Sequence, residues 1–320
     1  MDREELELFG KGLRHATANH TGEALDAALA ELGWRDALAA DPRAVVPLLF
    51  ELQGAANATS SALDDVVLAA LDTAPTTAVG VVLPSLGRWD APGRVEGEEL
   101  AVSGVGSAGL RRRAAAVVVA RTGDGHVAAI VETRRLVLRE VGGIDPAFGM
   151  VEVAAGRVRR RERAPAPSTA WPDALAAGQL AVGHELLGAA RQMLWLACDH
   201  ARERIQFGRP IASFQAVRHR LADTRVAVDA AEAALAAAWD DGSPLTAALA
   251  KALAGRGAGA ARRHCQQVLA GIGFTSEHPF HRYVRRTLVL DGLLGDARSL
   301  TRRLGDDLLG GGRLPAILPL

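Results

Sequence analysis

Apolar residues recur at two different spacings along this chain, and the spacing changes twice. Over residues 1–75 they fall three or four positions apart, as Leu25 and Leu29 do, which is typical of amphipathic helices. Pro42 follows Asp41, a combination that suits the first turn of a helix. These 75 residues therefore predict an N-terminal helical domain.

Residues 76–168 instead carry short runs rich in valine and other residues that favour β-strands. The runs at 115–120 and 127–131 flank Thr-Gly-Asp-Gly at 122–125, a combination that predicts a β-hairpin. Further strand-like runs lie at 136–138 and 150–153. We expect a small, reduced antiparallel β domain, followed by a linker at 164–168.

Helical spacing returns in residues 169–320 and predicts four long helices with short connections. They are expected at residues 175–201, 214–238, 244–270 and 283–309. Short connections make an antiparallel four-helix bundle the natural packing. The fold class predicted for the whole chain is α+β and mostly α.

The composition of the chain argues against several classes of function. Apolar residues make up 49 % of 320 residues, which is enough for a sizeable core, and 37 basic residues balance 37 acidic ones. A net charge of zero argues against a nucleic-acid binder. No apolar run is long enough to span a membrane, and the acidic start does not resemble a signal peptide. With Cys198 and Cys265 interpreted as core thiols, we expect a cytoplasmic protein.

Two further stretches only superficially resemble a dinucleotide-binding motif and a metal site. Residues 104–109 match G-x-G-x-x-G, but no helical pattern follows them, so we interpret them as a glycine-rich loop. His278 and His281 lack the spacing of a metal site, and no metal is expected.

The most specific stretch joins the first two helices of the predicted bundle. It contains Arg204, Gln206, Phe207 and Gly208, with Gln215 further on. A guanidinium can donate two hydrogen bonds to a pyrophosphate, and a phenylalanine can cover the edge of an aromatic ring system. A second stretch, residues 267–279, begins with Gln267 and is rich in glycine. Glycine lets the backbone approach a ligand closely.

These two stretches resemble segments of the acyl-CoA dehydrogenase family, R-x-x-F-G-x-x-I...Q and Q-x-x-G-G-x-G-[FY]-x-x-[ED]. The resemblance implies that Arg204, Gln206, Phe207, Gln267 and Gly271 contact the pyrophosphate and adenine end of an FAD. It also implies an oligomer, because in that family the second segment reaches the flavin of the neighbouring subunit. Ala270 stands where the family usually has glycine. The order of helices, β domain and four-helix bundle is the family's order too.

The resemblance weakens where the flavin ring and the substrate should bind. Residues 82–90 lie where relatives carry L-T-E-P-x-A-G-S-D, but the threonine and glutamate are missing. Residues 103–108 lack the tryptophan and threonine of the strand that packs on the ring. Residues 143–146, Gly-Ile-Asp-Pro, do resemble a turn of the family's β domain.

The family's reaction needs a carboxylate that removes the α-proton of the acyl-CoA. Of the two positions at which relatives place this glutamate, one corresponds to Leu294 and the other to Gly178. Glu185, two helical turns from Gly178, and Asp296 are the two candidates for a relocated base.

The hypothesis is therefore a subunit of a heteromeric FAD-dependent acyl-CoA dehydrogenase of the short kind found in the breakdown of steroids and other bulky acyl-CoAs. We expect it to pair with a paralogous full-length subunit, as an α2β2 heterotetramer, with the partner supplying the base and the ring pocket. Two alternatives stay open: a self-sufficient dehydrogenase that uses Glu185 or Asp296, and a cofactor-free structural subunit.

Overall fold

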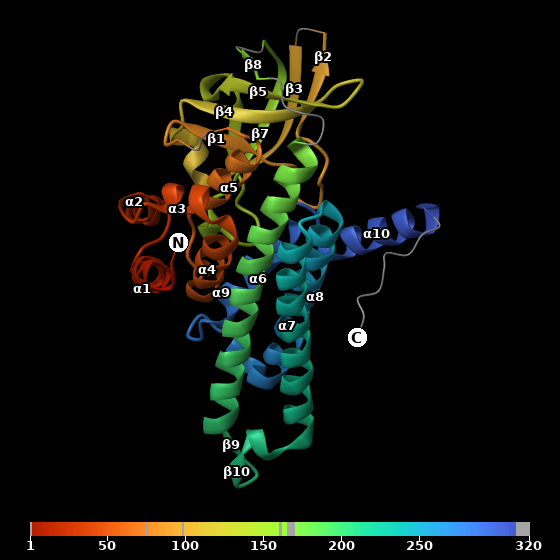
Figure 1. Ribbon diagram of the computed structural model, residues 1–320. Helices are drawn as coiled ribbons and strands as arrows, with labels where there is room; N and C mark the ends of the chain where they lie inside the picture. Colours follow the sequence, from red (N-terminus) through yellow and green to blue (C-terminus); the bar gives the residue numbers. More distant parts are fainter. Residues whose placement is uncertain (1, 74–75, 98, 160–161, 165–169, 312–320) are drawn as a thin grey trace.

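The computed structural model describes residues 2–73, 76–97, 99–159, 162–164 and 170–311, and Figure 1 shows three regions in chain order. The N-terminal region is helical, as predicted. Its helices are α1 (Arg3–Asn19), α2 (Glu23–Glu31), α3 (Trp34–Ala40), α4 (Pro42–Ala56) and α5 (Ala62–Ala70). Asp41 caps α4 by accepting a hydrogen bond from the Ala44 N–H, and Pro42 occupies its first turn. Trp34 and Phe50 are buried in the core that these helices share.

The middle region is one sheet. Its strands are β1 (Val79–Val82), β2 (Gly93–Glu96), β3 (Glu99–Gly106), β4 (Ala115–Arg121), β5 (His126–Glu132), β6 (Val137–Glu140), β7 (Val151–Arg159) and β8 (Glu162–Ala164). Their order is β6-β7-β3-β2-β4-β5-β8, with β1 paired to β4. The sheet is mixed rather than purely antiparallel, because β1 and β2 both run parallel to β4. The four predicted strand-like runs correspond to β4, β5, β6 and β7.

The sequence did not predict β1, β2, β3 or β8. Residues 104–106, interpreted as part of a loop, complete β3, and a 3-10 turn, η1 (Ala108–Arg112), follows them. Paired strands on both sides supplied hydrogen bonds that the glycine-rich sequence did not reveal. Most of the linker predicted at 164–168 lies outside the described residues, and Ala164 itself ends β8.

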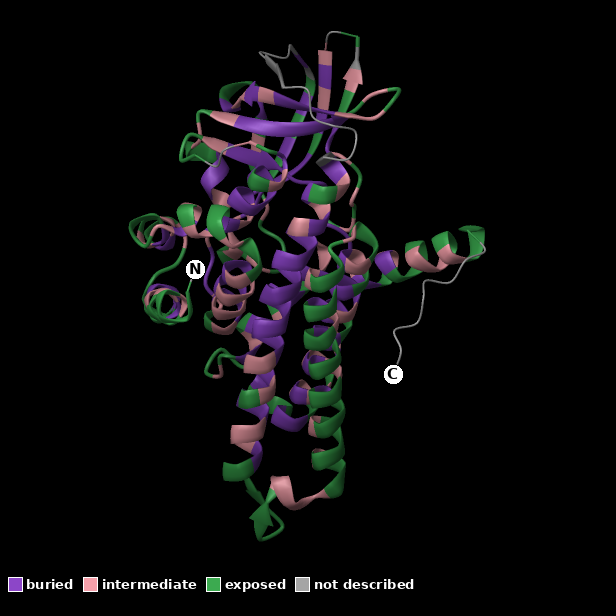
Figure 2. Ribbon diagram, in the orientation of Figure 1, coloured by how far each residue is buried: buried purple, intermediate pink, exposed green. Residues whose placement is uncertain are grey.

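The C-terminal region is a bundle of long helices, as predicted. Its helices are α6 (Ala170–Glu203), α7 (Gln215–Asp241), α8 (Pro244–Leu269) and α9 (Phe280–Gly292), followed by α10 (Ala297–Gly311). Helix α6 runs through the middle of the molecule and is buried along much of its length (Figure 2). No helix in the described part of the chain is long and apolar enough to cross a bilayer.

The fourth predicted helix, residues 283–309, is two helices rather than one. The chain turns at Leu294 and Gly295, which have φ angles of 58° and 99°, and α10 then leaves the bundle (Figure 1). The ammonium group of Lys251, buried in α8, donates hydrogen bonds to the main-chain oxygens of Asp291 and Gly295 at 3.0 and 3.2 Å. Helical spacing on both sides of the turn hid it from the sequence.

Helices α4 and α6 cross with their backbones in contact. A Cβ built on Gly54 would lie 2.1 Å from the Glu185 carbonyl oxygen, and one built on Gly188 would lie 2.1 Å from that of Glu51. Any larger residue at either glycine would push the helices apart. This close crossing brings polar side chains of α4 to Glu185 on α6.

Candidate functional site

The turn between α9 and α10 packs against the first half of α6. Leu294, in this turn, is 1 % exposed. A Cβ built on Gly178 of α6 would lie only 2.6 Å from the Leu294 Cδ1, so glycine is what admits the leucine. The two positions at which the resemblance placed a base therefore meet in one small space. Neither carries a carboxylate.

Residues 82–90, which correspond to the L-T-E-P segment, contact the end of α9 next to the same turn. The Gly87 N–H donates a hydrogen bond to the Gly292 carbonyl oxygen at 2.7 Å. The Trp171 indole N–H donates to the Trp89 carbonyl oxygen at 3.2 Å, which ties the segment to α6. The main-chain hydrogen bond of Gly87 fixes this residue against the end of α9.

Glu185 is a buried carboxyl group in the middle of α6. The Gln53 amide donates to its Oε2 at 3.0 Å, and the Ser60 hydroxyl donates to the Gln53 Oε1 at 2.6 Å. Its Oε1 has no hydrogen-bond partner. Burial raises the pKa of Glu185 to about 7, an effect that the charge of Arg286 and the Gln53 hydrogen bond offset only in part. The group can therefore exchange a proton near neutral pH.

Arg286 on α9 is buried next to Glu185. Its Nε–H donates to the Asp145 carboxylate at 2.8 Å, its Nη1 donates to the Ala58 carbonyl oxygen at 2.7 Å, and Nη1 is 3.9 Å from the Glu185 Oε1. The guanidinium also lies over the Phe148 ring, 4.6 Å from its centre. One arginine thus joins α9 to the β domain, to the end of α4 and to α6.

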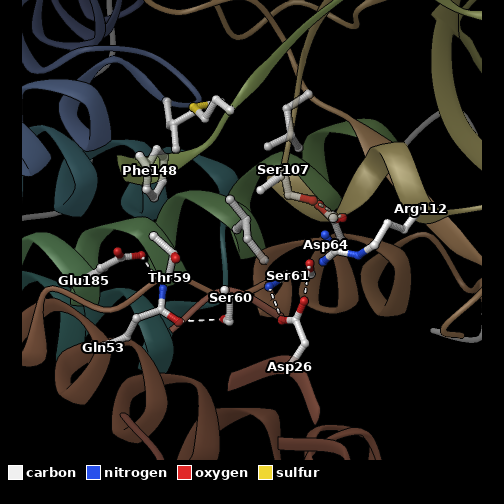
Figure 3. A pocket seen from close by; sticks show the side chains of 17 residues that line it. Asp26, Gln53, Thr59, Ser60, Ser61, Asp64, Ser107, Arg112, Phe148 and Glu185 are labelled. Atoms are coloured by element: carbon white, nitrogen blue, oxygen red, sulfur yellow. Dashed lines mark hydrogen bonds between the residues drawn. The ribbon is translucent and has the colours of Figure 1, made fainter. Parts of the chain in front are cut away.

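Glu185 lines a cavity of about 50 Å³ between α4, α5, α6 and the β domain (Figure 3). Asp64 of α5 also lines this cavity, with Oδ2 accepting from the Ser107 hydroxyl at 2.8 Å and Oδ1 without a partner. Burial raises the pKa of Asp64 to about 7 as well. Because a water needs roughly 10–15 Å³ in this measure, the cavity has room for a few waters and none for a bulky acyl chain.

Asp296, the other candidate base, caps α10. Its carboxylate accepts hydrogen bonds from the N–H groups of Arg298 and Ser299, both at 3.0 Å. Partial burial raises its pKa, but these hydrogen bonds outweigh that effect, and the pKa of Asp296 lies below its ordinary value. A carboxylate that already accepts two hydrogen bonds at a helix N-terminus is poorly suited to remove a proton from a substrate.

The Arg204 stretch forms an exposed hairpin at the far end of the bundle, made of β9 (Ile205–Gln206) and β10 (Arg209–Pro210) (Figure 1). Phe207 and Gly208 have φ angles of 52° and 74°, as a two-residue turn with two left-handed residues requires. The Phe207 ring is 92 % exposed and stands edge-on to Phe214. The Arg204 side chain makes no hydrogen bond or ion pair with the described residues, and Gln206 donates only to the Ile205 carbonyl oxygen.

The Gln267 stretch lies where α8 ends and a 3-10 turn, η5 (Ala270–Phe274), begins. Gln267 and Gly271 are exposed, and a Cβ built on Gly271 would meet nothing within 4 Å. Ala270 has a φ of 52° and a ψ of −134°, a backbone conformation that strains any residue with a side chain. This backbone geometry explains why the family usually has glycine at the position of Ala270.

The two stretches lie at the same end of the bundle. His200 is in the last turn of α6, next to the Arg204 hairpin, and His278 follows η5. Partial burial and the charges of His200 and His281 hold the pKa of His278 below its ordinary value. The five residues predicted to contact FAD, Arg204, Gln206, Phe207, Gln267 and Gly271, are all exposed. Glu185 lies in a different part of the molecule.

The sequence analysis missed Gln53, Asp64 and Arg286. One signal was present: Arg286 occupies the apolar stripe of α9, between the buried residues Tyr283 and Leu290. An arginine on a buried stripe needs a carboxylate partner. Gln53 and Asp64 carried no comparable signal, since both become important only through the crossing of α4, α5 and α6. Within the described residues, no three His, Cys, Asp or Glu side chains are grouped to hold a metal ion.

Known proteins support the resemblance. Residues 171–309 match the family model "Acyl-CoA dehydrogenase, C-terminal domain". The chain is 40% identical over 124 residues to acyl-CoA dehydrogenase IpdE2 of Mycobacterium tuberculosis, a match that covers 39% of each protein. It is 44% identical over 127 residues to acyl-CoA dehydrogenase FadE34 of the same organism, covering 38% of this chain and 18% of that one. The aligned part is thus well under half of either relative.

Two solved structures share the fold over nearly the whole chain. One is the Tcur3481-Tcur3483 steroid ACAD G363A variant, with a TM-score of 0.81, 22% identity and coverage of 97% of this chain and 99% of that one. The other is the ChsE4-ChsE5 complex from Mycobacterium tuberculosis, with a TM-score of 0.79, 21% identity and coverage of 99% of both chains. The predicted resemblance and fold class are confirmed: residues 171–309 form an acyl-CoA dehydrogenase C-terminal domain, and the chain has the acyl-CoA dehydrogenase fold.

Proposed function

Because this chain carries an acyl-CoA dehydrogenase C-terminal domain within the fold of that family, we propose that it is one subunit of a heteromeric FAD-dependent acyl-CoA dehydrogenase. It contributes contacts to the pyrophosphate and adenine of an FAD whose ring lies in a paralogous full-length partner. The partner also holds the catalytic base. The assembly is an α2β2 heterotetramer, and its substrate is a bulky acyl-CoA of the steroid type.

One contrast carries the proposal. The positions at which relatives place a base, Gly178 and Leu294, are packed against each other, while the residues that resemble the FAD-tail contacts are exposed at the other end of the bundle. A subunit that binds only the tail of a shared cofactor needs the second surface and not the first. Two structural neighbours, the ChsE4-ChsE5 complex and the Tcur3481-Tcur3483 steroid ACAD, support a partnered arrangement.

The residues at the exposed end suit the tail of an FAD chemically. The Arg204 guanidinium is free to donate two hydrogen bonds to a pyrophosphate, and the Phe207 ring is free to cover an adenine. Gly271 adds open backbone, and the Gln267 amide adds donors beside it. The ring end is different, because the segment at 82–90 lacks the threonine and glutamate that relatives carry there. When bound, FAD accepts the hydride of the dehydrogenation.

The test is the flavin content of the chain purified alone and of the chain co-purified with its full-length partner. The chain alone should be nearly colourless, and the complex should show a flavin spectrum with one FAD per pair of unlike subunits. A homo-oligomer of this chain that purifies yellow and fully loaded would show that its own ring pocket is intact. A colourless complex in which both subunits are present would favour the cofactor-free structural subunit instead.

One observation favours the self-sufficient dehydrogenase as a second candidate. Glu185 has an unpartnered oxygen that lines a cavity and a pKa raised to about 7, which are properties of a general base. Against it, the cavity is small and Arg286 already neutralises part of its charge. Activity of the complex after removal of the Glu185 carboxylate separates the two candidates.

A further inference from the structure

A buried histidine lies where the N-terminal helices meet the bundle. His184 of α6 is 5 % exposed, and α6 lies between α4 and α7 (Figure 1). Gly188, one turn further along α6, lets α4 approach so closely that the Glu51 side chain reaches the histidine. On α7, Trp239 packs against both the bundle core and the N-terminal core. Glu51, His184 and Trp239 thus join the two helical regions of the molecule.

The hydrogen bonds of His184 fix which ring nitrogen carries the proton. The indole of Trp239 can only donate, so its Nε1–H donates to the His184 Nε2 at 3.0 Å. A neutral imidazole that accepts at Nε2 has its single proton on Nδ1. The His184 Nδ1 lies 2.9 Å from the Glu51 Oε1 and donates to it. His184 is therefore neutral in this arrangement, with its proton on Nδ1.

The charged groups around the histidine come from all three helices. The Glu51 carboxylate of α4 also accepts from the Arg191 Nη1 at 2.5 Å, and the Arg191 Nη2 lies 2.6 Å from the Glu232 carboxylate of α7. Arg43 and Asp240 form a further ion pair between α4 and α7. Each of these carboxylates has an arginine as its cation, so the fold does not need a charged imidazole as their counter-ion.

We propose that His184 is a pH-sensitive latch, whose protonation releases Trp239 and loosens α7 from α6. An imidazolium donates from both nitrogens and accepts at neither, so the indole N–H then faces a second N–H and has no acceptor. The Glu51 carboxylate accepts the Nδ1–H in either state, so only the contact with α7 changes. Histidine is the side chain whose charge ordinarily changes in mildly acidic solution. The latch does not depend on the FAD contacts proposed above, because it shares no residue with them.

Nitrogen NMR of the full chain tests the position of the proton directly. At about pH 8 the His184 ring should carry its proton on Nδ1, and the hydrogen bond should shift the Trp239 indole N–H signal downfield. Trp239→Phe identifies this signal among those of the five tryptophans, and His184→Gln identifies the ring signals. A ring that carries its proton on Nε2 at this pH would overturn the proposal, because Nε2 could not then accept from the indole.

Acidification from about pH 8 to about pH 5 tests the release of Trp239. In the parent, its indole N–H signal should move upfield and exchange faster with solvent. His184→Gln is the locked variant, since an amide can accept from the indole and donate to Glu51 at every pH, and its indole signal should stay in place. His264→Gln is the control, because that histidine of α8 contacts Thr224 instead, and it should respond as the parent does. The proposal is overturned if the parent signal does not move, or if His184→Gln responds as the parent does.

Amide hydrogen exchange tests whether α7 itself responds. On the same acidification, the last two turns of α7, which end at Asp241, should lose protection relative to an unstructured peptide at the same pH. The loss should occur in the parent and in His264→Gln, but not in His184→Gln. Equal protection at both pH values in the parent would overturn the latch, because the released indole would not have loosened the helix.

Discussion

The middle of α6 and the region beyond its C-terminal end have opposite characters. Around its middle, Glu185, Gly178 and the α9–α10 turn form a closed interior in which polar groups are satisfied mainly by one another. Beyond its last turn, the Arg204 hairpin and η5 expose a charged guanidinium and two aromatic rings, with Phe207 at 92% and Phe274 at 77% exposure. A closed interior at the positions where relatives place a base can serve the stability of the fold alone. Exposed aromatic rings near an unpaired arginine do not stabilise an isolated chain. They indicate a surface that binds a ligand or another protein.

The largest effect should come from the closed interior. Arg286→Met would leave the Asp145 and Glu185 carboxylates buried without their shared cation. We expect a loss of about 3–5 kcal/mol in the free energy of unfolding, measured by urea denaturation. Arg285→Met, at an exposed position on the same helix, is the control and should change little. Adding Asp145→Asn and Glu185→Gln to Arg286→Met should recover part of the loss, and no recovery would contradict the ion-pair account.

The next effect is a dependence of stability on pH. Because the pKa values of Glu185 and Asp64 rise to about 7 from 4.5 and 3.8, the folded chain keeps protons that the unfolded chain has released. The contribution of these two groups to stability is therefore greatest in acid and falls as pH rises from about 4.5 through about 7, by about 3 kcal/mol for Glu185.

Glu185→Gln and Asp64→Asn should each remove part of this decline, and the double variant most of it. A smaller decline should persist, because burial also raises the pKa of Asp65. The measurement is the free energy of unfolding between about pH 5 and about pH 8. Equal slopes in the parent and double variant would mean that neither carboxyl is protonated in the folded chain.

The exposed end should respond in ligand binding rather than in stability. Arg204→Ala removes a charge-assisted contact to the pyrophosphate, and we expect FAD binding by the complex to weaken by about 1.5–3 kcal/mol. The complex should stay assembled, as measured by sedimentation, while its flavin content falls. Arg256→Ala, an exposed arginine on α8, is the control. Flavin content at the parent level in Arg204→Ala would show that this arginine does not contact FAD.

Ala270 offers a smaller test at the same end. Its φ of 52° and ψ of −134° are reached without strain only by glycine. Ala270→Gly should therefore stabilise the chain by about 1 kcal/mol, the strain relieved less the entropy that glycine adds to the unfolded chain. Ala233→Gly in the exposed face of α7 should do the reverse by a similar amount. Destabilisation by Ala270→Gly would mean that η5 is not strained.

The smallest expected effect is on catalysis by the complex. If the partner supplies the base, Glu185→Gln and Asp296→Asn should leave kcat for dehydrogenation of a bulky acyl-CoA within about tenfold, since loss of a true general base costs roughly 10²–10⁴-fold. Flavin content and assembly, measured on the same samples, exclude indirect losses. A fall of about a thousandfold in either variant with both unchanged would move the active site into this chain.

The sequence alone determined the order of helices, sheet and bundle, strands β4 to β7 and the stretches that carry Arg204 and Gln267. These are local features, because periodicity, turn residues and motifs act over a few neighbouring positions. The two positions at which the resemblance places a base were likewise readable as Gly178 and Leu294, residues that cannot accept a proton.

Only the tertiary structure decided what became of those positions. The break at Leu294 and Gly295, the packing of Leu294 on Gly178, and the enclosure of Glu185 by Gln53 and Arg286 each join segments more than 100 residues apart or divide a continuous helical pattern. The contacts of His184 with Glu51 and Trp239 likewise exist only because α4, α6 and α7 pack together. Burial and partner charge set the pKa of a carboxyl group and the cost of a cation, and both are properties of the folded chain that no local pattern contains.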